Sequence, residues 1–217
     1  MSEQKYWRQL DIVNNDKLSI PITIIGAGAV GSFVCLTLAK MGCTDITVYD
    51  DDDIDTHNIS NQFYREQDCG NSKVESLKAI IKEFDNIDIK IVSKKYKNQS
   101  LEGIIISAVD SMNVRNDIWK NIKYNPSIKL FIDGRMGAEV MRIYTVKPHD
   151  KDEIKFFEKY LYTEKEAEEL KCTEKSIIYN VAVVSGLITN QVKKYCMEQE
   201  YNKELIFDLK NLLFIKN

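Results

Sequence analysis

Residues 19–31 read SIPITIIGAGAVG. The first half of this stretch is almost continuously apolar, which is typical of a strand buried on both faces of a parallel sheet. The second half carries Gly26, Gly28 and Gly31 in the pattern G-x-G-x-x-G, and a helical stretch follows. Glycines at this spacing allow a tight turn and let the backbone approach a phosphate at the helix N-terminus. We therefore expect a strand, a phosphate-binding loop and a helix in succession.

Strands and helices alternate on the C-terminal side of this unit. Apolar runs predict strands at 46–49, 103–109 and 128–132, and the alternation of Ile87, Ile89 and Ile91 predicts another. Helical periodicity predicts helices at 72–84 and 114–122. Ser72 and Glu75 have the spacing of a capping box, and Gly42 is placed to end the helix after the glycine-rich loop. This order is typical of an α/β fold, and we expect a doubly wound, Rossmann-like, mostly parallel sheet.

The pattern changes after Gly137. Partial alternation between residues 139 and 147 predicts an antiparallel strand, residues 176–200 a long helix, and residues 205–215 a terminal hairpin. The charge-rich stretch 149–171 is expected to be a surface excursion with a short helix after Thr163. We expect a single domain over residues 1–217, with an N-terminal arm at 1–18, a nucleotide-binding core at 19–135 and a C-terminal antiparallel extension at 136–217.

The composition argues against several classes of protein. The 217 residues carry 30 Lys and Arg against 33 Asp and Glu, a net charge of −3 without a basic stripe, so we expect no nucleic acid partner. No apolar run is long enough to span a bilayer, and the N-terminus lacks a signal-peptide core, so we expect no membrane partner. The five cysteines are dispersed and form no CxxC, which argues against structural zinc and favours reduced thiols in the cytoplasm.

Three of the predicted strands end in aspartate, at Asp50, Asp110 and Asp133. In a doubly wound sheet these ends face the ligand crevice, and Asp50 is placed to accept hydrogen bonds from ribose hydroxyls. Clustered carboxylates would repel a dinucleotide pyrophosphate, but they suit a nucleotide that carries magnesium. We therefore favour a magnesium nucleotide over a nicotinamide cofactor, and a functional role for Asp110 over that of a turn residue.

Two further residues have two interpretations each. Lys73 lies in the first turn of a predicted helix, where a cation opposes the helix dipole, so it is either a phosphate ligand or a solvated lysine. Cys172 precedes Thr173, a predicted N-cap, and it lies between Lys171 and Lys175. A helix N-terminus and two cations would stabilise a thiolate, so Cys172 is either a reactive cysteine or one without a catalytic role.

An ordered series of residues resembles a known family. The series comprises Arg8-Gln9, Gly26–Gly31, Asp50, Asn58 with Gln62, Gly70 with Lys73, Asp110 with Arg115, Asp133-Gly134, and Cys172 ahead of a helix of small residues. In this order and spacing, nearly the whole chain resembles the ThiF/MoeB/HesA superfamily, which is related to the ubiquitin-activating enzymes. The loop at 57–65 is long and rich in amide and aromatic side chains. A dehydrogenase needs no such loop after the acid that binds the ribose.

The resemblance implies adenylation of a carboxylate with ATP. In the superfamily, the C-terminal glycine carboxylate of a small carrier protein or peptide becomes an acyl-adenylate and pyrophosphate leaves. The resemblance implies that the glycine-rich loop lies against the phosphates, that Asp50 binds the ribose and that Asp110 holds magnesium. It also implies phosphate contacts for Asn58 and Lys73. Some relatives use a cysteine at the position of Cys172 to take the acyl group, and others pass the adenylate directly to a sulfur carrier, so both routes stay open.

The resemblance further implies a homodimer in which Arg8 reaches into the partner subunit's site. The segment Tyr6-Trp7-Arg8-Gln9 lies well ahead of the first strand and outside the core pattern. We therefore expect a neighbouring subunit, rather than its own chain, to order this arm.

The sequence departs from the superfamily pattern at Asn61. Where the superfamily pattern Asn-x-x-Arg-Gln has its arginine, this sequence has Asn61, and Arg65, four residues later, is a candidate substitute. The departure leaves open a second interpretation, a non-catalytic subunit that binds nucleotide or acts as a scaffold. A nicotinamide- or flavin-dependent oxidoreductase is a third, supported only by the glycine-rich loop and Asp50. Adenylation of a carboxylate on tRNA is a fourth, disfavoured by the acidic charge balance.

Overall fold

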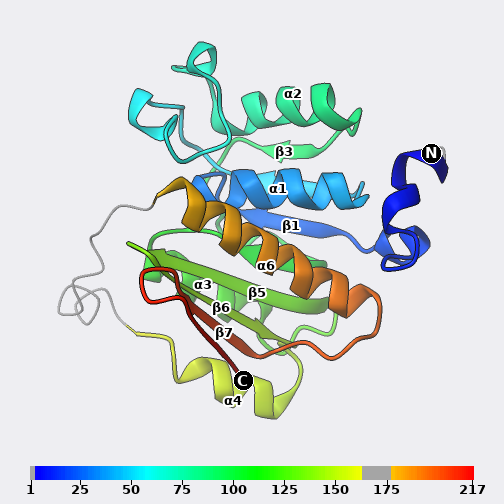
Figure 1. Ribbon diagram of the computed structural model, residues 1–217. Helices are drawn as coiled ribbons and strands as arrows, with labels where there is room; N and C mark the ends of the chain where they lie inside the picture. The colour runs from blue at the N-terminus through cyan, green and yellow to red at the C-terminus, as the bar shows by residue number, and fades with distance from the viewer. Residues whose placement is uncertain (1–2, 163–176) are drawn as a thin grey trace.

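The computed structural model describes residues 3–162 and 177–217 (Figure 1). Cys172 and the helix expected after Thr163 therefore lie outside the described residues. Within the described part, no helix combines the length and the apolar character needed to cross a bilayer.

The described strands form one eight-stranded sheet in the order β3-β2-β1-β4-β5-β6-β7-β8. The first five along the chain pair in parallel: β1 (Ile22–Ile25), β2 (Ile46–Tyr49), β3 (Lys90–Val92), β4 (Gly103–Ser107) and β5 (Ile128–Gly137). Three more continue the sheet in antiparallel fashion: β6 (Val140–Val146), β7 (Glu204–Asp208) and β8 (Leu213–Lys216). The order 3-2-1-4-5 is that of a Rossmann-like sheet, so the predicted fold class and its antiparallel extension are confirmed.

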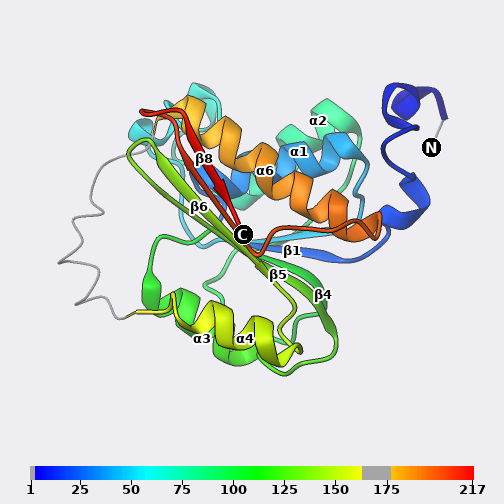
Figure 2. The same ribbon diagram turned by 60° about the horizontal axis from the view of Figure 1, so that its bottom comes forward.

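Helices cover both faces of the sheet (Figure 2). One face carries α1 (Ala29–Met41), α2 (Lys73–Asp85) and α6 (Ile178–Cys196), and the other carries α3 (Met112–Ile122) and α4 (Lys151–Glu158). Successive strand residues enter different cores, because Ile24 packs in the cluster of α1 and α6 while Ile25 packs in that of α3 and α4. With both faces buried, β1 and β4 are almost entirely apolar, which is why the sequence predicts them as continuous runs.

The helix ends test two expectations. The predicted end of α1 is confirmed, since Gly42 has a φ of +113° and donates its N–H to the carbonyls of the last turn. The capping box of Ser72 and Glu75 is wrong, because the Ser72 side chain makes no cap hydrogen bond to α2. Ser72 instead forms a β-bridge with Asp53. The helix α4 has no counterpart among the predicted elements.

The N-terminal arm contains two short 3-10 helices, η1 (Glu3–Gln9) and η2 (Asn15–Leu18), and it is attached to its own chain. Tyr6 is buried, Lys5 forms a salt bridge of 3.1 Å with Asp85, and Gln9 donates a hydrogen bond to the carbonyl of Met41. The arm therefore has a place on its own chain, which differs from the sequence-based expectation. These contacts place it at the C-terminal ends of α1 and α2, away from the glycine-rich loop (Figure 1).

Candidate nucleotide-binding site

The glycine-rich loop connects β1 to α1, and its three glycines have different roles. Gly26 has a φ of +97°, and a Cβ there would lie 2.7 Å from the carbonyl oxygen of Ala108. A Cβ on Gly31 would lie 1.8 Å from the carbonyl oxygen of Gly26, so only glycine lets α1 pack this closely. A Cβ on Gly28, the N-cap of α1, would meet nothing within 4 Å. The open side of Gly28 leaves the helix N-terminus accessible to an anion.

Asp50 follows β2 and joins it to the glycine-rich loop. Its Oδ2 accepts a hydrogen bond of 2.6 Å from the N–H of Ala27, and its Oδ1 accepts one of 2.9 Å from the N–H of Asp52. Burial raises the pKa of Asp50, and these two backbone hydrogen bonds oppose the shift. An ionised carboxylate has about four acceptor positions, so Asp50 retains acceptors for the hydroxyls of a ribose.

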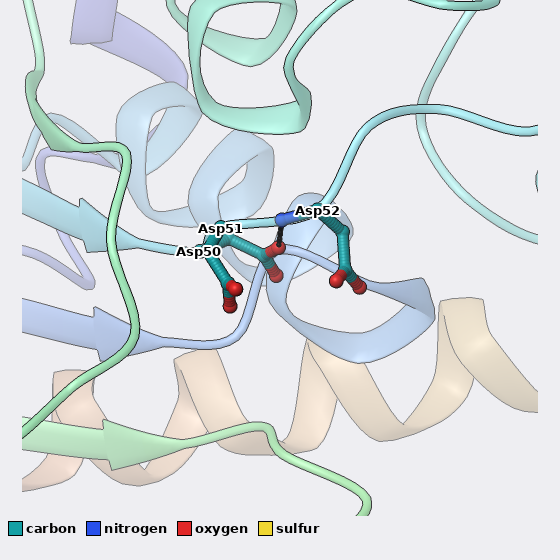
Figure 3. A group of neighbouring side chains, drawn as sticks. All are labelled: Asp50, Asp51 and Asp52. Carbon is teal, nitrogen blue, oxygen red and sulfur yellow. Dashed lines mark hydrogen bonds between the residues drawn. The ribbon is translucent and has the colours of Figure 1, made fainter.

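Three consecutive acids, Asp50, Asp51 and Asp52, lie where β2 ends, next to the turn between β1 and α1 (Figure 3). One carboxylate oxygen from each lies within 4.8 Å of the others. Lys73 is buried, and its Nζ contacts Oδ2 of Asp52 at 2.6 Å. This pair accounts for a cation in the first turn of α2, because Asp52 offsets the unfavourable helix dipole. A phosphate group could replace Asp52 as the anion beside Lys73.

The loop after these acids contains η3 (Thr56–Asn58) and η4 (Glu66–Asp68) and carries the predicted amide ligands. Asn58 is buried, and its Oδ1 accepts a hydrogen bond from the N–H of Asp55. The Oε1 of Gln62 is buried and has no hydrogen-bond partner among the described residues. Asn61 is partly exposed and has interaction partners of its own. A buried acceptor without a donor is the kind of group that a ligand can satisfy.

Two contacts attach this loop to the glycine-rich loop and to the first turn of α1. Tyr64 is buried, and its hydroxyl donates a hydrogen bond of 2.6 Å to the carbonyl oxygen of Ala27. The N–H of Phe63 donates to Oγ of Ser32 on α1 at 3.0 Å. The predicted amide ligands are therefore held beside the predicted phosphate and ribose ligands.

Asp110 follows β4, which lies next to β1 in the sheet. Its side chain is exposed, and within the described residues its carboxylate takes part in no hydrogen bond or ion pair. An exposed carboxylate without a partner is available to a cation. Asp110 therefore stands at the same end of the sheet as Asp50, about two strand spacings away, or roughly 10 Å.

Asp133 does not face the crevice, although it follows a predicted strand. It is fully buried, and it pairs with Arg115 on α3 at 2.8 Å and with Arg135 at 2.7 Å. Burial by itself would raise the pKa of Asp133, but the two guanidinium groups outweigh burial and hold the pKa below its ordinary value. Asp133 is thus an ionised internal partner of two arginines.

Two predicted cations lie apart from these groups. Arg65 holds Asp68 with two hydrogen bonds of 3.0 and 3.1 Å and Glu83 with one of 2.8 Å. Contact between Arg65 and a nucleotide stays a prediction, and it would require the side chain to leave both acids. Arg8 is exposed on the arm at the far end of α1, a helix about 20 Å long at 1.5 Å per residue. Arg8 is therefore remote from the glycine-rich loop of its own chain.

The family model described as the ThiF family matches residues 8–214. The chain belongs to the ThiF family. This ThiF-family chain is 31% identical over 104 residues to the SUMO-activating enzyme subunit uba-2 of Caenorhabditis elegans, covering 44% of the chain and 18% of the relative. It is 38% identical over 72 residues to the NEDD8-activating enzyme E1 catalytic subunit of Dictyostelium discoideum, covering 33% of the chain and 16% of the relative. These matches span less than a fifth of either curated relative.

Solved structures share the fold of this ThiF-family chain. PaaA has a TM-score of 0.79 at 17% identity, over 99% of this chain and 72% of PaaA. MccB of E. coli, solved with ATP, has a TM-score of 0.77 at 17% identity, over 94% of this chain and 65% of MccB. At 17% identity, the structural similarity to PaaA and MccB shows a shared fold and nothing further.

Sequence reasoning missed two residues of this ThiF-family site region, Tyr64 and Arg135. Arg135 lies two residues after Asp133 on the same strand, so the period of two could have placed both side chains on one face. No pattern marks the hydroxyl of Tyr64, because its partner Ala27 lies 37 residues away on a different loop.

Proposed function

We propose that this ThiF-family chain is an ATP-dependent adenylyltransferase that activates the C-terminal carboxylate of a small carrier protein or peptide as an acyl-adenylate. One observation carries the proposal. The open N-terminus of α1 at Gly28, the ribose-type acceptor Asp50 and the exposed Asp110 lie at one end of three adjacent strands. The curated relatives are subunits of activating enzymes, and MccB has been solved with ATP, which supports ATP as the nucleotide.

The charges around the site favour ATP with magnesium over a dinucleotide. Residues 50–53 are all aspartates. A carboxylate at Asp50 would repel the 2′-phosphate of NADP. Asp110 offers an exposed oxygen ligand of the kind that magnesium prefers, so the residues present fit the ion. When bound, magnesium would neutralise charge on the departing pyrophosphate.

The chain's own groups supply the remaining parts of the reaction. The N–H groups at the start of α1 hold the α-phosphate, and Lys73 exchanges Asp52 for a phosphate oxygen. Asn58 adds a further phosphate contact. With the phosphates held, a carboxylate oxygen of the carrier attacks the α-phosphorus, and the bond from this phosphorus to the pyrophosphate oxygen breaks.

Carrier-dependent exchange of labelled pyrophosphate into ATP tests the proposal. A carrier that ends in a free glycine carboxylate should support exchange, and the same carrier with an amidated C-terminus should not. Asp110→Asn is expected to lower exchange by a factor of about 10²–10³, the usual loss of one electrostatic contact in a transition state. Asp117→Asn is the matched control, because Asp117 is an exposed acid on α3 that pairs with Lys120.

The second candidate function is a non-catalytic subunit that binds nucleotide or acts as a scaffold, and the asparagine at position 61 favours it. The two candidates differ in one result: a wild-type chain that binds ATP yet supports no exchange with any carrier would support the scaffold. Asn61→Arg should raise exchange if the missing arginine limits phosphate binding. The role of Cys172 stays a prediction.

We also propose a homodimer in which each arm serves the site of the other chain. Arg8 is exposed and remote from its own glycine-rich loop. Trp7, Leu10 and Ile12 are exposed on the same arm at 73%, 49% and 60%, which supports contact with a neighbouring subunit. A guanidinium suits a phosphate, because its planar fork makes paired hydrogen bonds and keeps its charge.

A further inference from the structure

Three charged side chains, from α3 and β5, form one internal network. Asp133 is fully buried and accepts hydrogen bonds from Nε of Arg115 at 2.8 Å and from Nε of Arg135 at 2.7 Å. Arg115 is only 6% exposed. Arg135 packs over the ring of Tyr144 and donates a hydrogen bond to the carbonyl of Tyr160. Asp133 thus fixes the orientation of both guanidinium groups.

The guanidinium of Arg115 binds the backbone just past the end of β4 and within the neighbouring strand β5. It donates to the carbonyl oxygen of Val109, to that of Asp110 at 3.4 Å, and to that of Gly134 in β5 at 3.2 Å. These contacts use the fork of an arginine, and the single ammonium of a lysine cannot reproduce them. Arg115 therefore ties the turn that carries Asp110 to the adjacent strand.

Stability alone is a weak explanation for this network. Buried ion pairs lose their hydration, and apolar side chains of similar volume often stabilise a fold as well or better. The network also has two cations for one carboxylate, and Nη2 of Arg135 is buried without a hydrogen-bond partner among the described residues. What the charges add is a set of directional hydrogen bonds to the carbonyls on both sides of the turn.

We propose that Arg115 and Asp133 are positioning residues for Asp110, and that Arg135 holds Asp133 from its other side. The network fixes the backbone at Asp110, so that its carboxylate meets a magnesium ion at a defined place relative to the nucleotide phosphates. The inference rests on the proposed role of Asp110. If so, the network affects only the magnesium-dependent part of nucleotide binding. The contacts that Asp50 and the glycine-rich loop make with the nucleotide do not depend on it.

Calorimetry of ATP binding with and without magnesium tests the inference. In Arg115→Lys, the affinity for ATP with magnesium should fall about tenfold, as is usual for a residue that orients a metal ligand, and the affinity for ATP alone should stay within about twofold. In the Asp110→Asn background, Arg115→Lys should have no further effect, because it acts through Asp110. Additive losses, or equal losses with and without magnesium, would show a structural role and overturn the inference.

Two more variants make the test independent of how well Arg115→Lys folds. Arg135→Lys keeps a cation beside Asp133 but loses the contact with Tyr160, so a smaller loss of the same magnesium-dependent kind is expected. Arg142→Lys is the matched control, because Arg142 lies directly across from Arg135 on β6 and does not contact Asp133. It should bind both forms of ATP as the wild type does.

The same data separate this inference from the proposed function. A wild-type chain that binds ATP equally well with and without magnesium overturns the inference, while nucleotide binding stands. Magnesium-dependent binding that responds to Arg115→Lys, in a chain without pyrophosphate exchange, supports the inference and contradicts only the proposed catalysis.

Discussion

The peptide backbone of Ala27 is bound on both sides by side chains from other loops. Its N–H donates to Asp50, and its carbonyl oxygen accepts the hydroxyl of Tyr64. Ala27 itself is fully buried between two glycines. The conformation of the glycine-rich loop therefore depends on two contacts that are complete before any nucleotide arrives.

Tyr64→Phe tests the second of these contacts. The substitution removes one buried hydrogen bond and keeps the ring, so the free energy of unfolding should fall by about 1 kcal/mol. The affinity for ATP should fall about fivefold, the equivalent of the same energy, because the loop is less well held. Urea unfolding and calorimetry measure the two effects.

Tyr201→Phe is the matched control for Tyr64→Phe. The hydroxyl of Tyr201 bonds the carboxylate of Glu153 and does not contact the glycine-rich loop. This variant should lose stability and keep its affinity for ATP. Equal ATP affinities of Tyr64→Phe and the wild type would contradict a role of Tyr64 in holding the loop.

The sequence predicts residues whose place follows from one local unit, and it predicts few whose place depends on distant partners. The three glycines and Asp50 belong to one strand–helix–strand unit, so their contacts with one another follow from the pattern. Arg65 is a case that the sequence did not resolve. Its position four residues after Asn61 predicts a substitute phosphate ligand, but in the fold its guanidinium is bound by Asp68 and Glu83. A linear pattern does not reveal which of several partners a long charged side chain will contact.

At the scale of an element, α1 begins without any side-chain cap. Its N-cap is Gly28, and its first turn contains no acid. The first N–H groups of a helix have no partners within the helix, so those of α1 are left to water or to a ligand. The helix thus presents uncapped N–H donors at the candidate nucleotide site.

Gly28→Ala tests this feature of α1. The φ of Gly28 is −75°, and a Cβ there meets no protein atom within 4 Å, so the free energy of unfolding should change by less than about 0.5 kcal/mol. The methyl group would occupy the approach of the phosphate, and ATP affinity should fall about tenfold or more. Calorimetry that shows unchanged affinity would contradict a phosphate at this place.

Gly186→Ala is the matched glycine control. A Cβ at Gly186 also meets nothing within 4 Å, but Gly186 lies on the exposed face of α6. Alanine is the better helix former, so this variant should gain up to about 1 kcal/mol of stability and bind ATP as the wild type does.

The N-cap of α4 gives a prediction for pH. The N–H groups of Glu153 and Asp152 bind the carboxylate of Asp150 and lower its pKa. A lowered pKa means that the ionised form stabilises the fold. This contribution is present above the unfolded pKa of about 3.9 and is lost as the pH falls through the lower folded value.

Asp150→Asn should remove this pH dependence and keep the cap, because asparagine accepts the same hydrogen bonds without titrating. Urea unfolding is measured from about pH 6 down to about pH 3, a range that includes the ordinary pKa of a carboxyl group. Over this range the wild type should lose more stability than Asp150→Asn. Identical pH slopes of the two proteins would contradict the proposed cap contribution.

The elements themselves were predictable where burial imposes a period. The buried strands β1 and β4 follow from apolar runs, and the terminal hairpin of β7 and β8 follows from its short apolar segments. The predicted strand at 128–132 is too short, because β5 continues to Gly137 through polar residues that pair with β6. The capping box failed for a similar reason, since the backbone of Ser72 is engaged by Asp53, which no local pattern reveals.

At the scale of the whole molecule, the arm and the candidate nucleotide site lie at opposite ends of α1 (Figure 1). The arm is anchored through Tyr6 and Gln9, yet Trp7 and Arg8 remain exposed. An anchored base with exposed apolar and cationic side chains is suited to dock on a second chain. The arrangement supports a site completed between two subunits.

Complementation tests the shared site. Arg8→Ala and Asp110→Asn should each be inactive alone, and a mixture that exchanges subunits should regain up to about a quarter of the wild-type activity, since half of the dimers are mixed and each has one intact site. Pyrophosphate exchange measures the recovery, and light scattering checks that dimers form.

A mixture of Lys73→Ala and Asp110→Asn is the control for this experiment. Both residues belong to the same chain's site, so every site in a mixed dimer lacks one of them and no activity should return. If neither mixture regains activity although the subunits exchange, Arg8 has no role in the partner's site. A fully active monomer would also show that Arg8 has no such role.

The central pairing of β1 with β4 also sets an order of assembly. Ile22 pairs with Ile104, whereas Gly137 pairs with Val140 across a tight turn. Closing the longer loop costs more chain entropy, so the β5–β6 hairpin can form early and the middle of the sheet late. The glycine-rich loop touches Ala108, just past β4, so it is complete only after that late step. A nucleotide would then bind only assembled chains, and it would slow their unfolding without hastening their folding.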